Sequence, residues 1–290
     1  MNILRAGILA AATFGLSACE TIIPAGDIMT EPAELMPVTD TGLTLENLGP
    51  AMRMLDVAVY DFPDLTGANE PEDDYAELSR AVTQGGAHLL VDVLRDAGNG
   101  KWFDVVERTR ADNLLRERQI IEQTQVAFTG QSGLPALRFA GTLIEGAIIG
   151  YDSNEITGGI GANYLGIGAF TEYREDIVTV SLRAVSVSTG RVLTSVTTTK
   201  TVYSVLSQSG LYQFVAVDEI LQFESGYSRN EPEIFAVREA MELAVLAMIV
   251  EGAQDGQWAF ADSAEQQRVI TEFQSRYNRL RYGIRNEEEA

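Results

Sequence analysis

Hydrophobic and polar residues follow two different periods along this chain, and each period predicts its own kind of element. Strand patterns run through 55–60, 102–106, 143–150, 177–187 and 191–202. Apolar residues at helical spacing run through 87–97, 109–125, 234–252 and 264–280. Thr189 and Gly190 stand between the last two strands and predict a hairpin turn. Because strands and helices alternate, we expect a soluble part of the α/β or α+β class.

The segment 155–175 has a second pattern, which a soluble domain does not require. Its first half alternates between an apolar set and a small or polar set up to Tyr164, and after Tyr164 the parity changes. A change of parity after a tight turn is expected of a hairpin that keeps one face on one side. Each arm has roughly the 9–11 residues that a tilted strand needs to cross a bilayer.

A similar pattern covers 205–229. Tyr212, Phe214 and Ala216 alternate with Gln213 and, further back, with Ser207 and Ser209. Asp218 and Glu219 predict the turn, after which a second arm alternates from Leu221 to Tyr227. The tyrosines near the arm ends suit a membrane interface. The alternative is that both hairpins are amphipathic and pack on a soluble core.

If the hairpins enter a membrane, the alternation assigns a face to each residue. The residues expected to face lipid are Ile156, Ile160, Tyr164, Leu165, Ile167, Tyr212, Phe214, Leu221, Phe223 and Tyr227. The residues expected to face the lumen are Glu155, Asn163, Gln213, Gln222 and Glu224. Two hairpins give four strands, open sheet edges cannot lie in hydrocarbon, and the smallest closed barrels have roughly eight strands. Several copies must therefore close one barrel, so membrane insertion requires a homo-oligomer.

The first 18 residues predict an export signal. Arg5 precedes an uncharged apolar run over 6–16, which is too short to span a membrane as a helix. Cys19, the only cysteine of the chain, follows small residues in a pattern that resembles a bacterial lipobox. In that pattern the cysteine becomes the first mature residue and carries a diacylglycerol and an N-acyl chain. The alternative is a plain export signal followed by a chance cysteine.

The next stretch, 19–50, is predicted to be an extended lipidated tether, and 51–290 to be the folded domain. Four of the eight prolines of the chain lie between residues 20 and 50, where there is little periodicity. Glu20, which follows the cysteine in place of an aspartate, favours sorting to the outer membrane. We therefore expect a lipid-anchored protein of the cell outer membrane.

Charge and composition exclude several classes of function. Without residues 1–18 the chain has 42 acidic and 20 basic side chains, a formal net charge of −22. Such a chain is not expected to bind nucleic acid by neutralising phosphates. One histidine and one cysteine exclude the common zinc sites and an intrachain disulfide. We expect no metal and no cofactor other than the lipid on Cys19.

Enzymatic readings find little support in the sequence. The chain lacks the Gly-Lys-Ser/Thr signature of a P-loop, and the glycines at 159 and 161 form only a fragment of a dinucleotide fingerprint. His88 has no Gly-x-Ser-x-Gly elbow to accompany it and is interpreted as a packed or surface residue. The acids of 109–125 are interpreted as a solvated helix face. The protein is predicted not to be an enzyme.

From about residue 55 to about residue 277, ordered motifs resemble the CsgG family of outer-membrane lipoproteins. The segments that carry the resemblance are 114–118, 145–151, 158–162, 165–169, 187–190 and 226–232. The resemblance implies an α+β subunit, with a periplasmic α/β domain and two hairpins that join a shared nonameric transmembrane β-barrel. It implies export of unfolded curli-type amyloid subunits by diffusion without nucleotide, with a CsgE-like cap and a CsgF-like extracellular partner.

The family narrows its channel with a loop that carries a tyrosine, an asparagine and a phenylalanine. In this chain the corresponding loop is 68–78, and counting back from Ser79 matches Leu78 and Glu77 to the last two positions. Tyr75 is the aromatic residue available for the first. The resemblance thus implies a constriction of Tyr75, Glu77 and Leu78, with acids at 70 and 72–74 around it, which would favour cations. The rival function is an envelope lipoprotein that scaffolds or binds without forming a pore.

Overall fold

The chain divides into two compact units, Met1–Pro37 and Val38–Ala290. The computed structural model describes residues 35–66, 83–131, 133–157, 172–206, 212–214 and 232–281. The helices and strands that it describes belong to the second unit, which combines a sheet and helices in an α+β fold. This agrees with the fold class predicted for the soluble part.

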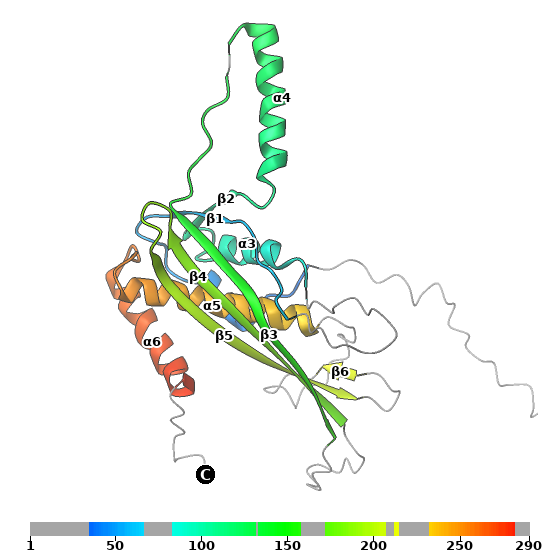
Figure 1. Cartoon of the computed structure of the whole chain (residues 1–290). Coiled ribbons are helices and arrows are strands. Elements are labelled where there is room, and N and C mark those ends of the chain that lie inside the picture. The colour runs from blue at the N-terminus through cyan, green and yellow to red at the C-terminus, as the bar shows by residue number, and fades with distance from the viewer. Residues whose placement is uncertain are drawn as a thin grey trace, which may run out of the picture. The chain divides into compact units, whose positions relative to one another are not determined.

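Six strands form one sheet in the order β2-β1-β3-β4-β5-β6 (Figure 1). The strands are β1 (Leu55–Val59), β2 (Phe103–Glu107), β3 (Thr142–Thr157), β4 (Glu172–Ser186), β5 (Val192–Leu206) and β6 (Tyr212–Phe214). β1 runs parallel to both β2 and β3, and the strands from β3 to β6 are antiparallel. Gly190, at φ +68°, adopts the left-handed conformation in the turn between β4 and β5 and confirms the predicted hairpin there.

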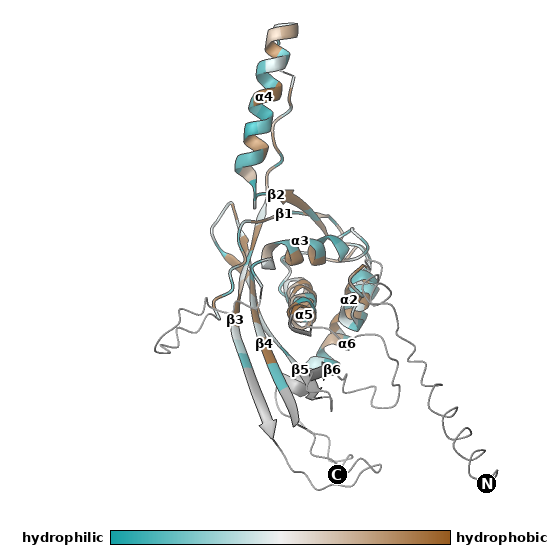
Figure 2. Cartoon of the chain, turned by 90° about the vertical axis from the view of Figure 1, so that its right-hand side faces the viewer, coloured by the Kyte–Doolittle hydropathy of each residue, from teal (hydrophilic) through white to brown (hydrophobic). Residues whose placement is uncertain are grey.

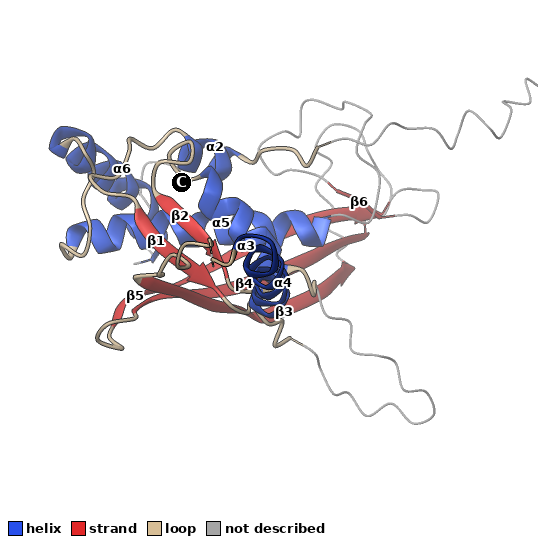
Figure 3. Cartoon of the chain, turned by 90° about the horizontal axis from the view of Figure 1, so that it is seen from above, coloured by secondary structure: helices blue, strands red, loops and turns tan. Residues whose placement is uncertain are grey.

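Helices cover one face of this sheet, as the view from above shows (Figure 3). The described helices are α2 (Asp40–Glu46), α3 (Gly86–Asp96), α5 (Pro232–Gln254) and α6 (Ser263–Arg281), together with α4 (Ala111–Thr129), which stands apart from the sheet (Figure 1). α5 contacts β4, β5, α2, α3 and α6. Those contacts explain why α5 is apolar nearly all round, since a helix surrounded by other elements has no face left for water.

Alternation along the strands divides the sheet into two faces. Ile148, Val180 and Val196 are buried on the face that α5 covers, where they belong to one core cluster. Thr197 and Thr199 of β5, which flank the buried Thr198, are exposed on the opposite face. Period-two burial of this kind follows directly from strand geometry and matches the pattern predicted from the sequence.

The N-terminal boundary of the domain differs from the one predicted. Residues 40–46 form α2, and Leu45 and Leu48 are buried in the main core, so the extended tether cannot reach residue 50. Thr39 caps α2 by accepting the N–H of Gly42 at 2.9 Å. A helix of seven residues is too short to show a reliable helical period, and the flanking prolines at 37 and 50 favoured a prediction of loop.

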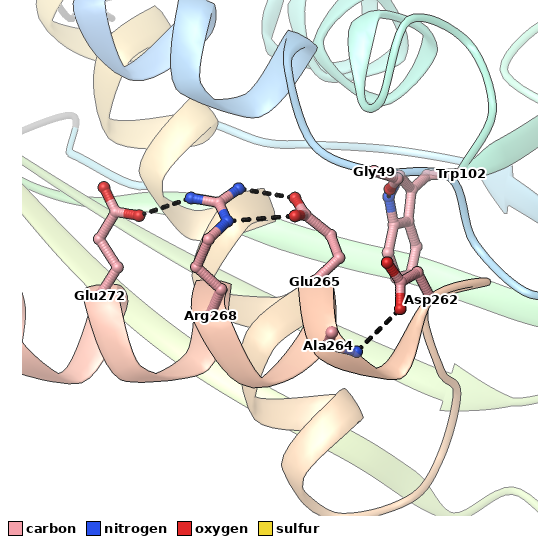
Figure 4. A network of polar contacts seen from close by, with 7 residues as sticks. All are labelled: Gly49, Trp102, Asp262, Ala264, Glu265, Arg268 and Glu272. Atoms are coloured by element: carbon pink, nitrogen blue, oxygen red, sulfur yellow. Dashed lines mark hydrogen bonds and ion pairs between the residues drawn. The ribbon is translucent and has the colours of Figure 1, made fainter.

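The connection between α2 and β1 is fastened by Trp102, which directly precedes β2 (Figure 4). The indole N–H of Trp102 donates to the Gly49 carbonyl at 2.8 Å, and its ring packs edge-on against Phe260 at 4.7 Å. Glu265 of α6 accepts two hydrogen bonds from Arg268, which hold the pKa of the Glu265 carboxyl below its ordinary value. The residues just before β1 are thus part of the folded core.

Candidate functional site

The predicted hairpin at 155–175 is the continuation of two sheet strands. β3 and β4 pair without interruption of the ladder from Thr142↔Ser186 to Thr157↔Glu172, apart from one register shift between Ile148 and Gly150. A 16-residue strand at about 3.3 Å per residue spans roughly 50 Å. Figures 1 and 2 show these strands running past the helices that cover the sheet. The strand predicted to end at residue 150 therefore extends into a long stem, and the tip, 158–171, lies outside the described residues.

The second hairpin differs from the prediction. β6 pairs antiparallel with the end of β5, Ser204 opposite Phe214 and Leu206 opposite Tyr212. The predicted hairpin over 205–229 had its turn at Asp218 and Glu219, whereas residues 212–214 pair back alongside 204–206. Ser207 and Ser209, which the predicted alternation included, lie outside the described residues. The predicted return arm from Leu221 lies outside the described residues.

The pairing register places Ile156, Tyr173, Val205 and Gln213 opposite one another in one row, and Glu155, Arg174, Ser204 and Phe214 in the next. The side chains of these residues are outside the described part of the structure, so their assignment to lipid or to the lumen stays a prediction. Alternation within one arm carries no information on the register between hairpins.

The segment that carries Tyr75, Glu77 and Leu78 lies outside the described residues, but both of its ends are described. The Asp64 carboxylate accepts the backbone N–H and the hydroxyl of Thr66 on one side and the N–H of Thr83 at 3.2 Å on the other. We name this set the Asp64 clamp. It joins two chain positions 19 residues apart through one side chain, so it fixes where the intervening segment leaves and re-enters the domain.

The Asp64 clamp is attached to the stem of the first hairpin. Ile148 of β3 donates its N–H to Pro63 at 3.1 Å and accepts the N–H of Leu65 at 2.9 Å. Beneath it, the buried ring of Phe62 lies against Gly86 and Gly146, where an added Cβ would come within 2.8 and 2.6 Å of ring carbons. The clamp, the start of α3 and the stem therefore meet at one place, beside the register shift of β3.

A buried carboxylate joins α2 to α5. Glu242 of α5 is 1% exposed, accepts the hydroxyl of Thr39, and accepts Arg238 Nε at 2.8 Å. Burial raises the pKa of Glu242, and the neighbouring charge of Glu239 raises it further, while the bonds from Thr39 and Arg238 act in the opposite direction. Asp96 of α3, which pairs with Arg238 at 3.3 Å, and Glu46 of α2 line the same small cavity. No signal in the sequence pairs Thr39 with a residue 203 positions away.

The remaining predicted site residues fall outside the described residues, so their positions stay predictions. They are Cys19, Ile160, Asn163, Tyr164, Leu165, Ile167, Leu221, Gln222, Phe223, Glu224 and Tyr227. His88 is exposed in the first turn of α3. Within the part of the chain that the structure describes, no cluster of three or more His, Cys, Asp or Glu side chains is placed to hold a metal ion.

None of the helices formed by the described residues combines the length and the apolar character needed to cross a membrane.

Comparison with known proteins identifies relatives over most of the chain. The family model for the curli production assembly/transport component CsgG matches residues 40–276. The component of that name from Escherichia coli K12 is 39% identical over 240 residues, which is 81% of this chain and 85% of the relative. The one from Salmonella typhimurium is 38% identical over 259 residues, 88% of this chain and 91% of the relative.

Among solved structures, the PelC dodecamer from Paraburkholderia phytofirmans aligns with 68% of this chain and 91% of its own, at 17% identity and a TM-score of 0.31. A TM-score of that size does not define a shared fold.

Replacing Asp64 by Ala is expected to loosen both ends of the 67–82 segment. Loss of a charged acceptor costs about 1.4 kcal/mol per amide, so the backbone N–H groups of Thr66 and Thr83 should exchange with deuterium roughly tenfold faster. Asp61→Ala is the control, because the Asp61 carboxylate accepts the adjacent Phe62 N–H instead. Unchanged exchange at Thr83 in Asp64→Ala would show that the clamp does not hold the segment.

The raised pKa of Glu242 predicts a pH-dependent contribution to stability. The folded protein takes up this proton at a higher pH than the unfolded chain does. For this group the free energy of unfolding therefore increases as pH falls through the folded pKa, and the increase is complete below the unfolded value near 4.5. Relative to Glu242→Gln, the wild type should gain stability on acidification toward pH 4.5, as measured by urea unfolding.

Glu265→Gln is the matched control of opposite sign. In the wild type the pKa of the Glu265 carboxyl is lowered by folding. The stabilising contribution of Glu265 is therefore present above the unfolded value of about 4.5 and is lost as pH falls through the folded pKa. Stability curves of the wild type and Glu242→Gln that run parallel from pH 7.5 to 4.5 would contradict the assignment for Glu242.

Proposed function

The chain belongs to the CsgG family of curli production assembly/transport components, and from this premise we propose that it is the subunit of an outer-membrane secretion channel. Its cargo would be unfolded curli-type amyloid subunits, which cross by diffusion without a nucleotide. A CsgE-like cap and a CsgF-like extracellular protein are the proposed partners. The family is named for assembly and transport, which agrees with the expectation that the protein is not an enzyme.

The observation that carries this proposal is the length of the central strands. β3 and β4 stay paired for the full distance from the core to Thr157↔Glu172, beyond the helices that bury the sheet (Figure 1). A hairpin that leaves the helical cover needs another environment for its apolar face. A bilayer provides one, provided that the backbone groups of every strand are paired.

Because the backbone groups of every strand in a bilayer must be paired, the proposal requires several copies of the chain to assemble. The hairpins of one copy have open edges, so neighbouring copies are proposed to pair edge to edge in a heterologous contact that closes a ring. The family resemblance gives nine copies. Each subunit would keep its helices and parallel strands in the periplasm and contribute its hairpins to the shared transmembrane β-barrel.

The N-terminal anchor has a defined reach in this proposal. Cys19, acylated after removal of residues 1–18, would hold the chain in the outer membrane. Because Thr39 already caps a core helix, the free tether has about 20 residues and extends at most about 70 Å. Several acyl chains on one cysteine hold a protein in the membrane more firmly than a single acyl chain does. The acidic domain therefore needs no charge attraction to lipid.

The channel constriction is proposed to consist of Tyr75, Glu77 and Leu78. The Asp64 clamp supports this choice, because a side chain that joins residues 66 and 83 would hold a segment between them at a fixed place in each subunit. Repeated around a ring, the acids at 70, 72–74 and 77 would form a negative belt that favours cations and polar extended peptides.

Electron microscopy of detergent-extracted protein is the direct test of the function. We expect rings with a central pore from the wild type and loss of membrane attachment, with the protein recovered in the soluble envelope fraction, for Cys19→Ala. Monodisperse monomers from extracted wild type would support the rival function, a scaffold or binding lipoprotein.

The constriction is tested by single-channel recording in planar bilayers. The double variant Tyr75→Ala, Glu77→Ala removes one ring and one carboxylate per subunit, so conductance should rise and the preference for cations should fall. Glu272→Ala on the exposed surface of α6 removes the same charge elsewhere and should leave both quantities unchanged. Wild-type conductance and selectivity in the double variant would exclude these residues from the narrowest point.

A further inference from the structure

α4 stands apart from the sheet, so its direction depends on the chain segments that join it to β2 and β3 (Figures 1 and 2). None of its 19 residues is buried, and packing against the core therefore does not fix that direction. The segment 133–141, which we name the return strap, leads from α4 to the start of β3 and contains neither helix nor strand. What holds the return strap thus decides where α4 points.

The return strap is bonded to α4 along the helix. Arg118 donates to the Pro135 carbonyl, and Gln125 accepts the N–H of Gly133 at 3.1 Å. The two helix positions are seven residues apart, which is about two turns, so the strap runs beside the helix axis between them. Helix and strap should therefore move as one unit.

Nearer to β3, the return strap crosses a pair of opposed carboxylates. Asp56 of β1 and Asp104 of β2 occupy directly opposite positions in the parallel β1–β2 pair. Like charges placed directly opposite each other destabilise a sheet. Arg138 of the strap supplies the cation between them, because its guanidinium donates to both carboxylates through different nitrogens. The donors of a guanidinium form a rigid fork, so one arginine can bond two carboxylates at once.

Arg108 fastens the same point of the strap from the other side of α4. It donates to the Arg138 carbonyl at 2.8 Å and to the Glu107 carbonyl at 2.7 Å. Since Arg108 lies in the connection from β2 to α4, the segments before and after the helix are joined to each other as well as to the sheet. We name the set of Arg138, Arg108, Asp56 and Asp104 the Arg138 clasp.

The Arg138 clasp is ionic and lies at the surface of the domain. The side chain of Arg138 is 63% exposed, and those of Asp56 and Asp104 are 29% and 35% exposed. Exposed ion pairs are individually weak and are screened by salt, so little energy is needed to open them. Val57 and Phe103, which adjoin the two aspartates in sequence, are buried in the core cluster. The carboxylates therefore stay in place when Arg138 leaves.

We propose that Arg138 is the positioning residue of α4. The closed clasp fixes the direction in which the helix projects from the sheet, and the open clasp lets the helix and the return strap swing together. The short connection 108–110 is then the hinge. This role concerns one subunit and holds whether or not copies of the chain assemble into a channel.

Trypsin reports on the clasp directly, because it must bind the free side chain of an arginine in order to cleave after it. In the full chain, Asp56→Asn with Asp104→Asn should release the Arg138 side chain and speed cleavage of the Arg138–Phe139 bond roughly fivefold. Cleavage after Arg191, an exposed arginine beside the β4–β5 turn, is the internal reference and should keep its rate. An unchanged rate after Arg138 would overturn the clasp.

The direction of α4 is measured by electron spin resonance, as distances between nitroxide labels. Gln123→Cys on α4 and Asp92→Cys on α3 place the labels at exposed positions. In the full chain with Cys19→Ala these are the only cysteines, and labelled subunits are diluted among unlabelled ones. The distance distribution should be narrow in this parent and roughly twofold broader after Arg138→Ala, because the helix then samples several directions.

The asparagine pair separates release of the strap from repulsion between the aspartates. Arg138→Ala leaves two unpaired carboxylates, whereas Asp56→Asn with Asp104→Asn leaves none, and both variants should show the broad distribution. Combining all three substitutions should broaden it no further, since they act on one clasp. In about 1 M NaCl, where the screening length is about 3 Å, the parent should broaden and Arg138→Ala should not.

Glu145→Gln is the matched control on the same sheet. Glu145 pairs with Arg183 at 2.9 Å at the surface and, among the described residues, bonds to no part of the return strap. This variant should keep the parent's cleavage rate after Arg138 and its narrow distance distribution. Equal widths in the parent and Arg138→Ala, or further broadening in the triple variant, would overturn the positioning role.

Discussion

The packing of α5 against β4 and β5 is the interaction on which the rest of the structure depends. Met241, Val245 and Met248 are fully buried in this layer, and Thr198 of β5 donates to the Ala240 carbonyl at 2.7 Å. Lys200 of β5 pairs with Glu239 of α5 at 2.8 Å. These contacts fix one half of each long strand in a dry core. The other half continues the same β-ladders, so its direction is set by packing that lies elsewhere.

This continuity explains why the elements of the candidate site meet where they do. A β-ladder transmits position along its length, and the register shift after Ile148 is the one place in the β3–β4 pair where that transmission changes. The chain segment 63–65 bonds to β3 at the same residue, and Asp64 from that segment reaches Thr83. A displacement of the stem would therefore move the base of the 67–82 segment with it. The geometry couples the proposed constriction to the proposed barrel through the backbone bonds of 63–65 to Ile148 and through the Asp64 carboxylate.

Prediction from the sequence succeeded where one local pattern decided the outcome. The periods of α3, α5 and α6, and the Thr189-Gly190 turn, depend on neighbours a few residues away, and each lies within a few residues of the prediction. Two kinds of feature were missed: elements of few residues, and contacts between residues that lie far apart in the sequence. α2 has too few residues to show a period, and the pairing of β6 with the end of β5 depends on contacts between strands. The bonds of Asp64 to Thr83 and of Thr39 to Glu242 join residues that no local pattern relates.

Net charge would oppose the proposed assembly, and this bears on which contacts between copies can matter. Subunits with a formal charge of −21 or more repel one another, and salt at physiological strength screens that repulsion beyond about 8 Å. Any attraction between two copies must therefore overcome this repulsion within about 8 Å, the distance over which salt leaves it unscreened. Backbone pairing between hairpins is such a force, but it operates only once the strands are already aligned.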